Sequence, residues 1–483
     1  MKPAEKYKLW IDGQEEEAEG GEYFAVIDPG CGEEIGLAAR GKSADIDRAV
    51  FSAHKAFYSQ DWYGLKPYER GRLMLKLAEK INLERDHIAK LLSIENGKPL
   101  HESYDEVETT VRNFEYYGGW ADKVHGRVVP ISNDVLDYIR LEPLGAVGHI
   151  IPWNYPLDIF ARGVAPCLAI GNTVVAKPAE ETPLSTLEIA RLSGEVGFPA
   201  GVINVVSGYG HEAGAALAGH PGIQGLAFCG SIEIGKQVLR AAVENITPVV
   251  SLELGGKSPL IIFPAADVEK ATSAGAHSIL YNTGQSCGCL SRVLVHDDLL
   301  EMVTQQIKDV LAKVRLGTWD EDADIGPLVS QGQMERVLRY IQVGLSEGAT
   351  LVSGGRRVES GSLNRGYFIE PTVFTDVRPG MRIIDEEIFG PVLGIITFKT
   401  EAEAIQIANG SKYGLSAEVW TRDLSQAHRV AAQLDVSHVT INGGGGFGIE
   451  APFGGVKQSG FGREGGWESI LQYSRVKNIW VNL

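Results

Sequence analysis

The sequence predicts an α/β protein with a doubly wound, Rossmann-like parallel sheet, a second α/β unit and a small β arm. From residue 144 onward, short β-branched apolar runs alternate with turns and helical patterns, as in a parallel sheet covered on both faces. A second alternating series runs from about Pro259 to Asn442. Outside both series, Tyr138–Glu142 alternates like a strand with one solvated face, and Val476–Val481 is a strand with exposed apolar residues.

The expected elements follow one another along the chain. An amino-terminal hairpin at Leu9–Gly13 turns at its Asp-Gly pair, and helical patterns cover residues 43–60 and 67–124. The strand Val476–Val481 pairs either with a neighbouring subunit or with its own domain. The first series is expected to hold strands at Ala146–Ile151, Thr173–Lys177, Val202–Val206, Gly225–Phe228 and Pro248–Leu252, and helices at Leu157–Ala169, Ser185–Val196, Gly210–Ala218 and Ser231–Ala242.

The composition excludes several classes of protein. Of 483 residues, 44% are hydrophobic and 22% are charged, which is typical of a globular chain with a large core. The 58 glycines have no Gly-X-Y period, so the chain is not collagen. A net charge of −17 disfavours nucleic acid as a partner, because phosphate binding needs clustered Lys and Arg. The uncharged stretches 213–232 and 271–291 contain Gly, Ser and His throughout, so no membrane span is expected.

The five cysteines point to a compartment and argue against a metal. The amino terminus lacks the apolar core of a signal peptide, and this predicts free thiols in the reducing cytoplasm. Cys287 and Cys289 form a C-x-C pair with no second pair of ligands nearby, so no metal site is expected.

Two turns of the first series are candidate nucleotide contacts. Gly208–Gly214 has one residue too many for the G-x-G-x-x-G fingerprint, whereas Gly230 and Ser231 open an expected helix, whose free N–H groups favour a phosphate. Lys177 and Glu180 follow another strand, where they could hold ribose hydroxyls. A purely structural turn at Ser231 and an exposed salt-bridged turn at Lys177 are the alternatives.

Three residues are candidates for covalent chemistry. Cys287 lies among small polar residues, whereas an inert buried cysteine normally lies among large apolar ones. Glu253 directly follows an apolar strand, and partial burial there raises a carboxyl pKa toward the range of a general base. Asn154 could donate its amide to an oxyanion. Beside a nucleotide fold, this set predicts acyl chemistry coupled to oxidation or reduction.

Together these segments resemble the NAD(P)-dependent aldehyde dehydrogenase superfamily in order and approximate spacing. The matching motifs span residues 151–457 and the flanking segments look similar, so the resemblance covers essentially the whole chain. The motifs are Ile151–Pro156, Lys177–Glu180, Phe228–Ser231, Leu252–Pro259, Gly284–Cys287, Glu386–Pro391 and Pro452–Lys457.

The resemblance implies a role for each matching residue. Cys287 is the nucleophile, Glu253 is the general base, and Asn154 with the Cys287 N–H forms the oxyanion hole, so that Cys289 is a bystander. The residues implied in binding the cofactor, NAD, are Ile151, Pro152, Trp153, Lys177, Glu180, Gly210, Gly214, Ser231, Ile234, Gln333, Glu387 and Phe389. Those implied in binding the aldehyde are Tyr155, Ile159, Phe447 and Phe453.

The mechanism that the resemblance implies has two stages. The Cys287 thiolate attacks the aldehyde carbonyl, hydride leaves to the nicotinamide, and a thioester remains. Glu253 then activates the water that releases a carboxylic acid. NAD is expected in preference to NADP, because Glu180 should accept a hydrogen bond from a free 2′-hydroxyl and repel a 2′-phosphate.

The substrate-side residues predict an apolar or aromatic aldehyde. Asp158 and Arg162, on the same expected helix, complicate this expectation, since they either face solvent or contact a polar substrate tail. Gly443–Gly446 replaces residues that are usually larger in the family and forms either a wider substrate entrance or a simple flexible loop.

Departures from the family pattern leave the NAD prediction in place. Cys229 and Ile232 stand where the common pyrophosphate segment has threonines, but Ser231 is kept. A CoA-acylating aldehyde dehydrogenase is the alternative within the enzyme class, although such enzymes generally lack a glutamate at the position of Glu253. A catalytically silent structural protein of the same fold is a second alternative.

The resemblance also implies a division of the chain. Residues 1–122 and 144–254 form the NAD-binding domain, residues 255–450 form the catalytic domain, and residues 123–143 and 465–483 form an oligomerisation segment. A homodimer or homotetramer is expected, built through the strands Val135–Leu141 and Val476–Val481.

Overall fold

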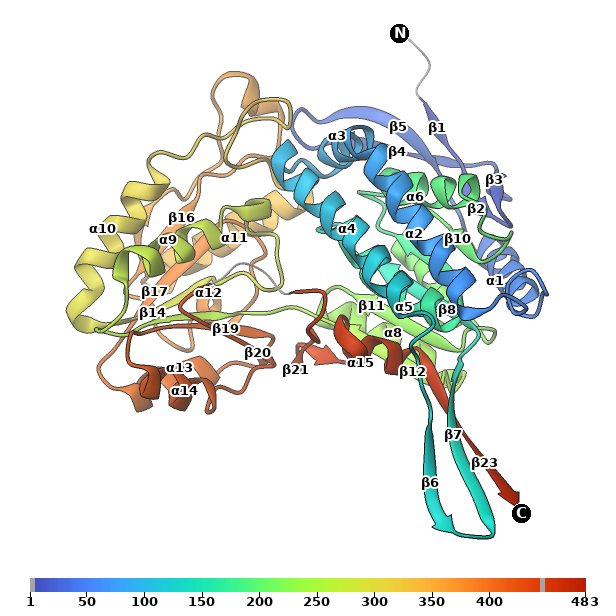
Figure 1. Cartoon of the computed structure of the whole chain (residues 1–483). Coiled ribbons are helices and arrows are strands. Elements are labelled where there is room, and N and C mark those ends of the chain that lie inside the picture. Colours follow the sequence, from blue (N-terminus) through green and yellow to red (C-terminus); the bar gives the residue numbers. More distant parts are fainter. Residues whose placement is uncertain (1–4, 444–447) are drawn as a thin grey trace.

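Two lobes and a projecting arm make up the molecule (Figure 1). The computed structural model describes residues 5–443 and 448–483, so Gly444–Gly446 and the expected substrate residue Phe447 lie outside the described residues. The predicted fold class is confirmed, because each lobe is built around its own largely parallel sheet with helices packed on it.

The first lobe contains an eight-stranded sheet in the order β22-β12-β11-β8-β9-β10-β2-β3. Neighbours from β12 to β10 run parallel, and the outer strands are antiparallel. The chain moves from β8 to β9 on one side and later returns to β11 on the other, which creates a switch point where ligands bind in open α/β sheets. The strands are β2 (Leu9–Ile11), β3 (Gln14–Glu16), β8 (Ala146–Ile151), β9 (Thr173–Pro178), β10 (Ile203–Val205), β11 (Gly225–Cys229), β12 (Val249–Glu253) and β22 (Gly460–Phe461).

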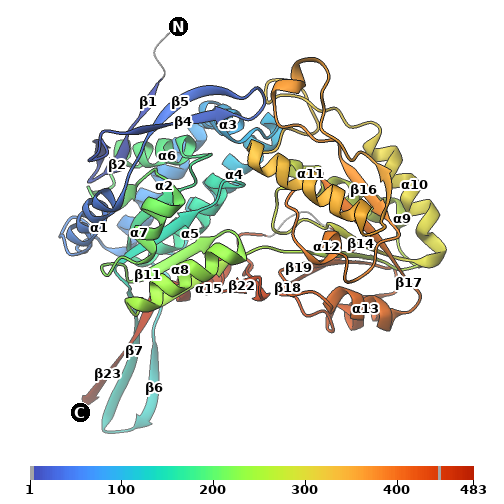
Figure 2. The same ribbon diagram turned by 180° about the vertical axis from the view of Figure 1, so that it is seen from behind.

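Helices cover both faces of this sheet. One face carries α1 (Ser43–Phe57), α7 (Ala215–Ala218) and α8 (Ile232–Glu244), and Figure 2 shows α7 and α8 on the side nearest the viewer. A separate apolar core lies on the other face, under α2 (Pro67–Leu83), α3 (Arg85–Asn96), α4 (Leu100–Trp120), α5 (Pro156–Ile170) and α6 (Leu184–Glu195). A short helix, α15 (Gly466–Gln472), packs against α5.

Local signals place most boundaries of the first lobe. The predicted hairpin turn forms at Asp12 and Gly13, whose φ values of +53° and +78° suit a tight two-residue turn. The helical pattern at 67–124 divides into α2, α3 and α4, because Gly97 ends α3 with a left-handed φ of +91° and Pro99 precedes α4. The helix expected from Gly210 begins as a π-helical turn, Gly210–Gly214.

The second lobe has a seven-stranded sheet in the order β15-β16-β17-β14-β13-β19-β20, in which only β15 is antiparallel to its neighbour. Its strands are β13 (Pro259–Ile262), β14 (Arg292–His296), β15 (Thr350–Ser353), β16 (Thr372–Thr375), β17 (Val392–Phe398), β19 (Ser416–Trp420) and β20 (His438–Ile441). Its helices are α9 (Val268–Ser278), α10 (Leu300–Leu311), α11 (Gln331–Ser346), α12 (Arg382–Asp385), α13 (Glu401–Asn409) and α14 (Leu424–Ala431).

Smaller sheets complete the molecule. A three-stranded sheet is formed by β1 (Lys6–Tyr7), β4 (Tyr23–Asp28) and β5 (Glu33–Ala39), and a two-stranded one by β18 (Tyr413–Gly414) and β21 (Val456–Lys457). The arm consists of β6 (Arg127–Ser132), β7 (Val135–Pro143) and β23 (Ser474–Asn482).

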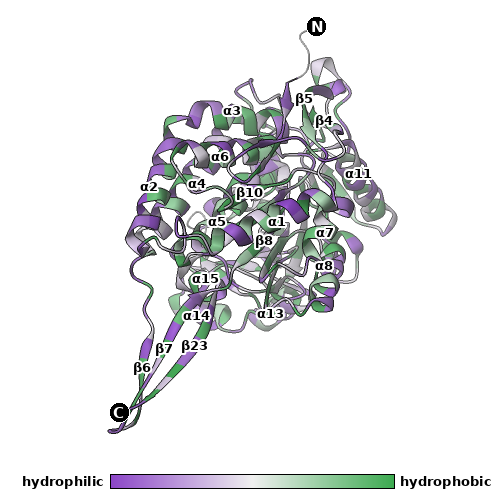
Figure 3. Cartoon of the chain, turned by 90° about the vertical axis from the view of Figure 1, so that its right-hand side faces the viewer, coloured by the Kyte–Doolittle hydropathy of each residue, from purple (hydrophilic) through white to green (hydrophobic). Residues whose placement is uncertain are grey.

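In the arm, the carboxyl-terminal strand pairs with its own chain. β23 runs antiparallel to β7 from Ser474 opposite Pro143 to Asn482 opposite Val135, and it forms one edge of the three-stranded arm sheet. Val476 and Trp480 are 68% and 52% exposed, and Figure 3 shows hydrophobic stretches along β7 and β23. Among the described residues, no helix has the length and apolar character needed to cross a bilayer.

Candidate active site

A cavity of about 490 Å³, here called the central cavity, lies beyond the carboxyl ends of β8, β11 and β12 and reaches into the second lobe. It therefore sits at the switch point of the first sheet. Many of the residues singled out in the sequence come together on its walls: Pro152, Trp153, Asn154, Ser231, Glu253, Cys287, Gln333, Glu387 and Phe389.

The turn before Cys287 has an unusual backbone. Asn282, Thr283 and Gly284 are consecutive left-handed residues with φ values of +47°, +57° and +69°. At Gly284 a side chain would also collide with the carbonyl oxygen of Gly390, so only glycine fits there. The Asn282 side-chain amide stabilises the turn by donating to the carbonyl oxygens of Asn154 (2.8 Å) and Gln285 (3.2 Å).

Burial dominates the electrostatics of the Cys287 thiol. It raises the pKa of Cys287 to about 12, and the Arg162 guanidinium acts in the opposite direction. The thiol is therefore protonated at neutral pH in the protein alone, and attack requires its proton to be removed as substrate arrives.

Glu253 ends β12 with its carboxylate inside the protein. The residue is 4% exposed, and neither carboxylate oxygen has a hydrogen-bond partner among the described residues. Burial, reinforced by the negative charge of Glu464, raises the pKa of Glu253 well above its ordinary value. A buried carboxyl group with free oxygens and a raised pKa is suited to accept a proton near neutrality.

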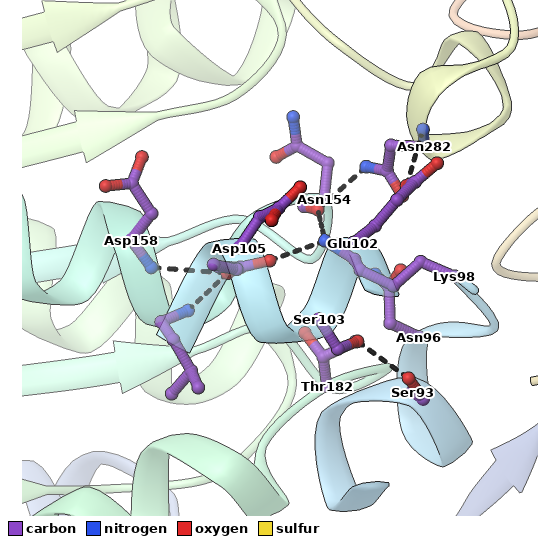
Figure 4. A network of polar contacts seen from close by, with 12 residues as sticks. Ser93, Asn96, Lys98, Glu102, Ser103, Asp105, Asn154, Asp158, Thr182 and Asn282 are labelled. Atoms are coloured by element: carbon purple, nitrogen blue, oxygen red, sulfur yellow. Dashed lines mark hydrogen bonds and ion pairs between the residues drawn. The ribbon is translucent and has the colours of Figure 1, made fainter. Parts of the chain in front are cut away.

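A buried network of charged side chains holds the backbone around Asn154 in place (Figure 4). The Lys98 ammonium donates to the Asn154 carbonyl oxygen (3.0 Å) and pairs with Glu106, whose other oxygen accepts from the Leu157 N–H (2.9 Å) at the start of α5. Glu102 accepts from the Asn282 N–H (2.8 Å). The network thus ties the Asn154 segment to the Cys287 turn.

Sequence reasoning missed this network. Lys98, Glu102 and Glu106 follow one another at intervals of four residues: Lys98 precedes α4, and Glu102 and Glu106 lie on the same face of this helix. That spacing was the available signal, although it is equally typical of a solvated helix face.

The start of α8 forms the phosphate side of the central cavity. Ser231 is the N-cap residue, and its hydroxyl accepts from the Ile234 N–H at 3.3 Å. Ser231, Ile232 and Glu233 line the cavity, so the positive end of this helix faces it. The predicted helix start is confirmed. The free backbone N–H groups at this helix start are suited to bind a pyrophosphate.

The opposite wall comes from the second lobe. Glu387 accepts from the Gly256 N–H (2.9 Å), and burial raises the pKa of Glu387 to about 7. The Phe389 ring packs edge-to-face on Trp153 at a centroid distance of 5.2 Å. The Gln333 amide donates to the Phe389 carbonyl oxygen at 2.6 Å and holds this segment in place.

Other predicted cofactor residues lie outside the central cavity. Lys177 and Glu180 form an ion pair of 3.0 Å at the end of β9, with Lys177 buried, and Gly214 lies next to the Lys177 side chain. Gly210 has open space where a side chain would be. The side chain of Ile234 is exposed, whereas Ile151 is part of the core of the first lobe.

A second cavity of about 200 Å³, here called the side cavity, holds two of the predicted substrate residues, Tyr155 and Phe453. Ile159 is buried in the core and lines neither cavity. The solvent-facing alternative for Asp158 and Arg162 is wrong, since both line the side cavity and are 18% exposed. The Arg162 Nε donates to Glu464 at 2.6 Å.

Several cavity residues were not found from the sequence. Arg336 and Tyr340 lie three and seven positions after Gln333 on α11, so the helical repeat places them on the face that Gln333 already marks. Arg336 donates to the Glu387 carbonyl oxygen at 2.7 Å. Lys412 and Tyr413 also line the central cavity, and no sequence signal distinguished them.

In both sequence and structure the chain is similar to proteins named as aldehyde dehydrogenases. The sequence profile of the Aldehyde dehydrogenase family matches residues 15–479. The chain is 42% identical to retinal dehydrogenase 2 of Homo sapiens, over 99% of this chain and 92% of the relative, and 42% identical to the mitochondrial aldehyde dehydrogenase of Equus caballus, over 99% and 95%. An aldehyde dehydrogenase from Bacillus cereus, solved in complex with NAD+, superposes with a TM-score of 0.97 at 44% identity, covering 99% of this chain and 97% of that one.

Proposed function

The chain belongs to the aldehyde dehydrogenase family and is an NAD-using enzyme that oxidises aldehydes. We propose that Cys287, Glu253 and Asn154 carry out this oxidation and that the product released is a carboxylic acid. One observation carries this proposal. A thiol, a buried carboxylate without partners and a side-chain amide line the same cavity as the amino end of α8.

In the proposed mechanism, the Cys287 thiol gives its proton to water in the cavity, and its sulfur bonds to the aldehyde carbon as the carbonyl π bond breaks. The carbonyl oxygen becomes an oxyanion, which accepts hydrogen bonds from the Asn154 amide and the Cys287 N–H. NAD, when bound, supplies the acceptor for the hydride that leaves the former aldehyde carbon. The acyl group then remains on Cys287 as a thioester.

Hydrolysis completes the cycle. Glu253 accepts a proton from water, the hydroxide adds to the thioester carbon, and the carbon–sulfur bond breaks to release the acid and the Cys287 thiolate. The Lys98 network supports this step and the first one, because it fixes the backbone of Asn154 relative to the Cys287 turn.

The proposed reaction is tested by mixing the purified enzyme with NAD and a panel of aldehydes and following NADH absorbance. NADH formation that needs no further acceptor supports release of an acid. NADH formation that depends on coenzyme A would favour the acylating alternative, which the presence of Glu253 argues against. No NADH with any aldehyde would refute the proposal.

Cofactor selectivity is proposed to depend on Glu180, which would accept a hydrogen bond from the ribose 2′-hydroxyl. Its ion pair with Lys177 keeps the carboxylate beside the end of β9. Replacing Glu180 with serine should raise the kcat/KM for NADP relative to that for NAD by about tenfold or more, since a like charge near the 2′-phosphate is removed. Comparable efficiencies of the unmodified enzyme with both cofactors would contradict this assignment.

For the substrate, we propose an aldehyde whose carbon chain is apolar or aromatic next to the carbonyl. Tyr155 and Phe453 support this, as both line the side cavity next to the catalytic residues. The remaining predicted contacts, Ile159 and Phe447, add no support, because the first is in the core and the second lies outside the described residues.

The arm is proposed to join subunits into a homodimer or homotetramer, and the lobes to be the NAD-binding and catalytic domains. The exposed apolar side chains of Val128, Val476 and Trp480 support an interface, because water-exposed patches of this kind are usually covered. The molar mass measured by light scattering would distinguish a dimer from a tetramer.

A cytoplasmic location is also proposed, and the free state of all five cysteines supports a reducing compartment.

A further inference from the structure

The side cavity adjoins the central cavity at two points. Asn154 lines the central cavity while the next residue, Tyr155, lines the side cavity. Phe453 lines the side cavity, and a side chain built on Gly454 would meet the Glu253 carboxylate. An aldehyde with its carbonyl at Cys287 therefore has the side cavity next to it. Its volume of about 200 Å³ is below the roughly 300–1,000 Å³ of common ligand pockets, so it suits a short tail.

Carboxylates outnumber cations in this cavity. Asp105, Glu106 and Asp158 line it, and Arg162 is the single lining cation among the described residues. Glu106 is neutralised by its buried pair with Lys98. Arg162 is held between Glu464 and Asp158, so its charge is already compensated and is a weak attractant for an anionic substrate.

Asp105 is the carboxylate without a compensating charge. It lies on α4 at the exposed side of the cavity, and no lysine, arginine or histidine of the described residues forms an ion pair with it. Arg112, further along the same helix, is paired with Glu450 at 3.1 Å. The hydroxyl of Tyr281 points toward Asp105 at 3.5 Å.

The aromatic rings that line the cavity also differ in whether a cation lies over them. The Lys98 ammonium lies 4.5 Å from the centroid of the Tyr155 ring, and the Arg162 guanidinium lies 5.1 Å from that of Phe453. The Tyr281 ring is stacked on the Tyr155 ring at a centroid distance of 6.5 Å. No lysine or arginine of the described residues lies over the Tyr281 ring. The ring without a cation therefore stands beside the carboxylate without a cation, and both groups attract positive charge.

From this arrangement we propose that the side cavity binds the cationic tail of a short ammonium-bearing aldehyde. The ammonium group lies between Tyr281 and Asp105, and the carbon chain crosses Tyr155 and Phe453 to a carbonyl at Cys287. The inference rests on the proposed function, because it places the aldehyde carbon at the thiol.

Three aldehydes of similar length test the charge directly. They are a butanal with a trimethylammonium group at its far end, its neutral isostere with a tert-butyl group in that place, and a semialdehyde with a terminal carboxylate. We expect kcat/KM to be highest for the cationic aldehyde, by about tenfold over the neutral isostere, with the carboxylate lowest. The preference should shrink as salt is added, since Asp105 is exposed to solvent.

The variant Asp105→Asn tests whether Asp105 causes the preference for the cationic aldehyde, since asparagine removes the negative charge and keeps the shape of the side chain. The variant should lose most of the preference through a higher KM for the cationic aldehyde, with kcat and the KM for the neutral isostere unchanged. Asp86→Asn is the matched control, because Asp86 is another aspartate that accepts from a tyrosine hydroxyl, that of Tyr104 at 3.0 Å, and it does not line the side cavity.

The outcomes separate this inference from the proposed function. NADH from the neutral isostere with equal or better efficiency than from the cationic aldehyde would overturn the cationic-tail assignment and leave the proposed function standing. A preference that persists in Asp105→Asn would overturn the assignment to this residue pair. No NADH from any of the three aldehydes, or from a wider panel, would overturn the proposed function and this inference with it.

Discussion

Replacing Cys287 with serine is expected to lower kcat for aldehyde oxidation by about 10³-fold or more, without a loss of NAD binding. A serine hydroxyl is a far weaker nucleophile than a thiol, and the Cys287 side chain already needs help to lose its proton, since burial raises its pKa to about 12. An ester formed on serine would also hydrolyse more slowly than a thioester. The measurements are steady-state NADH formation and NAD affinity by titration.

Cys289→Ser is the matched control for this variant. Cys289 lies two residues away and is equally a free thiol, but its sulfur donates to the carbonyl oxygen of Ser278 at 3.2 Å and does not line the central cavity. Its replacement should leave kcat within about threefold of the unmodified enzyme, as expected for a residue outside the machinery. Loss of activity in Cys289→Ser with retention in Cys287→Ser would reverse the assignment of the nucleophile.

Glu253→Gln is expected to lower steady-state kcat by about 10²- to 10⁴-fold while sparing the first turnover. The amide cannot accept a proton from water, so the thioester on Cys287 should accumulate. A rapid burst of about one NADH per active site followed by slow turnover is the expected trace in stopped-flow absorbance. An unchanged steady-state rate would exclude Glu253 as the base.

The pH dependence of the unmodified enzyme follows from the same residue. Only the ionised carboxylate accepts a proton, and burial beside Glu464 raises the pKa of Glu253, so kcat should increase with pH until that raised pKa is passed. This rise should be absent in Glu253→Gln. Glu418→Gln is the control, since burial also raises the pKa of Glu418 but its carboxylate accepts from the Trp420 indole, away from both cavities.

Local signals in the sequence determined the elements of the fold. Asp12 and Gly13 turn the first hairpin, and Ser231 begins α8, because such conformations depend on a few neighbouring residues. Runs of β-branched residues between helical patterns determined the alternation of strands and helices, since a parallel strand buried on both faces must be apolar throughout. The motifs that lead to the family are equally local, and they contain Cys287, Glu253 and Asn154.

Only the tertiary structure decided which distant groups meet. Arg162 and Glu464 are 302 residues apart in the chain yet bonded at 2.6 Å, and nothing within either segment indicates that contact. The ion pair of Lys98 with Glu106, and the hydrogen bond from Lys98 to the Asn154 carbonyl oxygen, are buried because α4 packs against the Asn154 turn. The charge of the side cavity arises in the same way, since its walls come from separate segments of the chain. Sequence patterns report the preferences of neighbouring residues, whereas burial and pairing of charges depend on how whole elements pack.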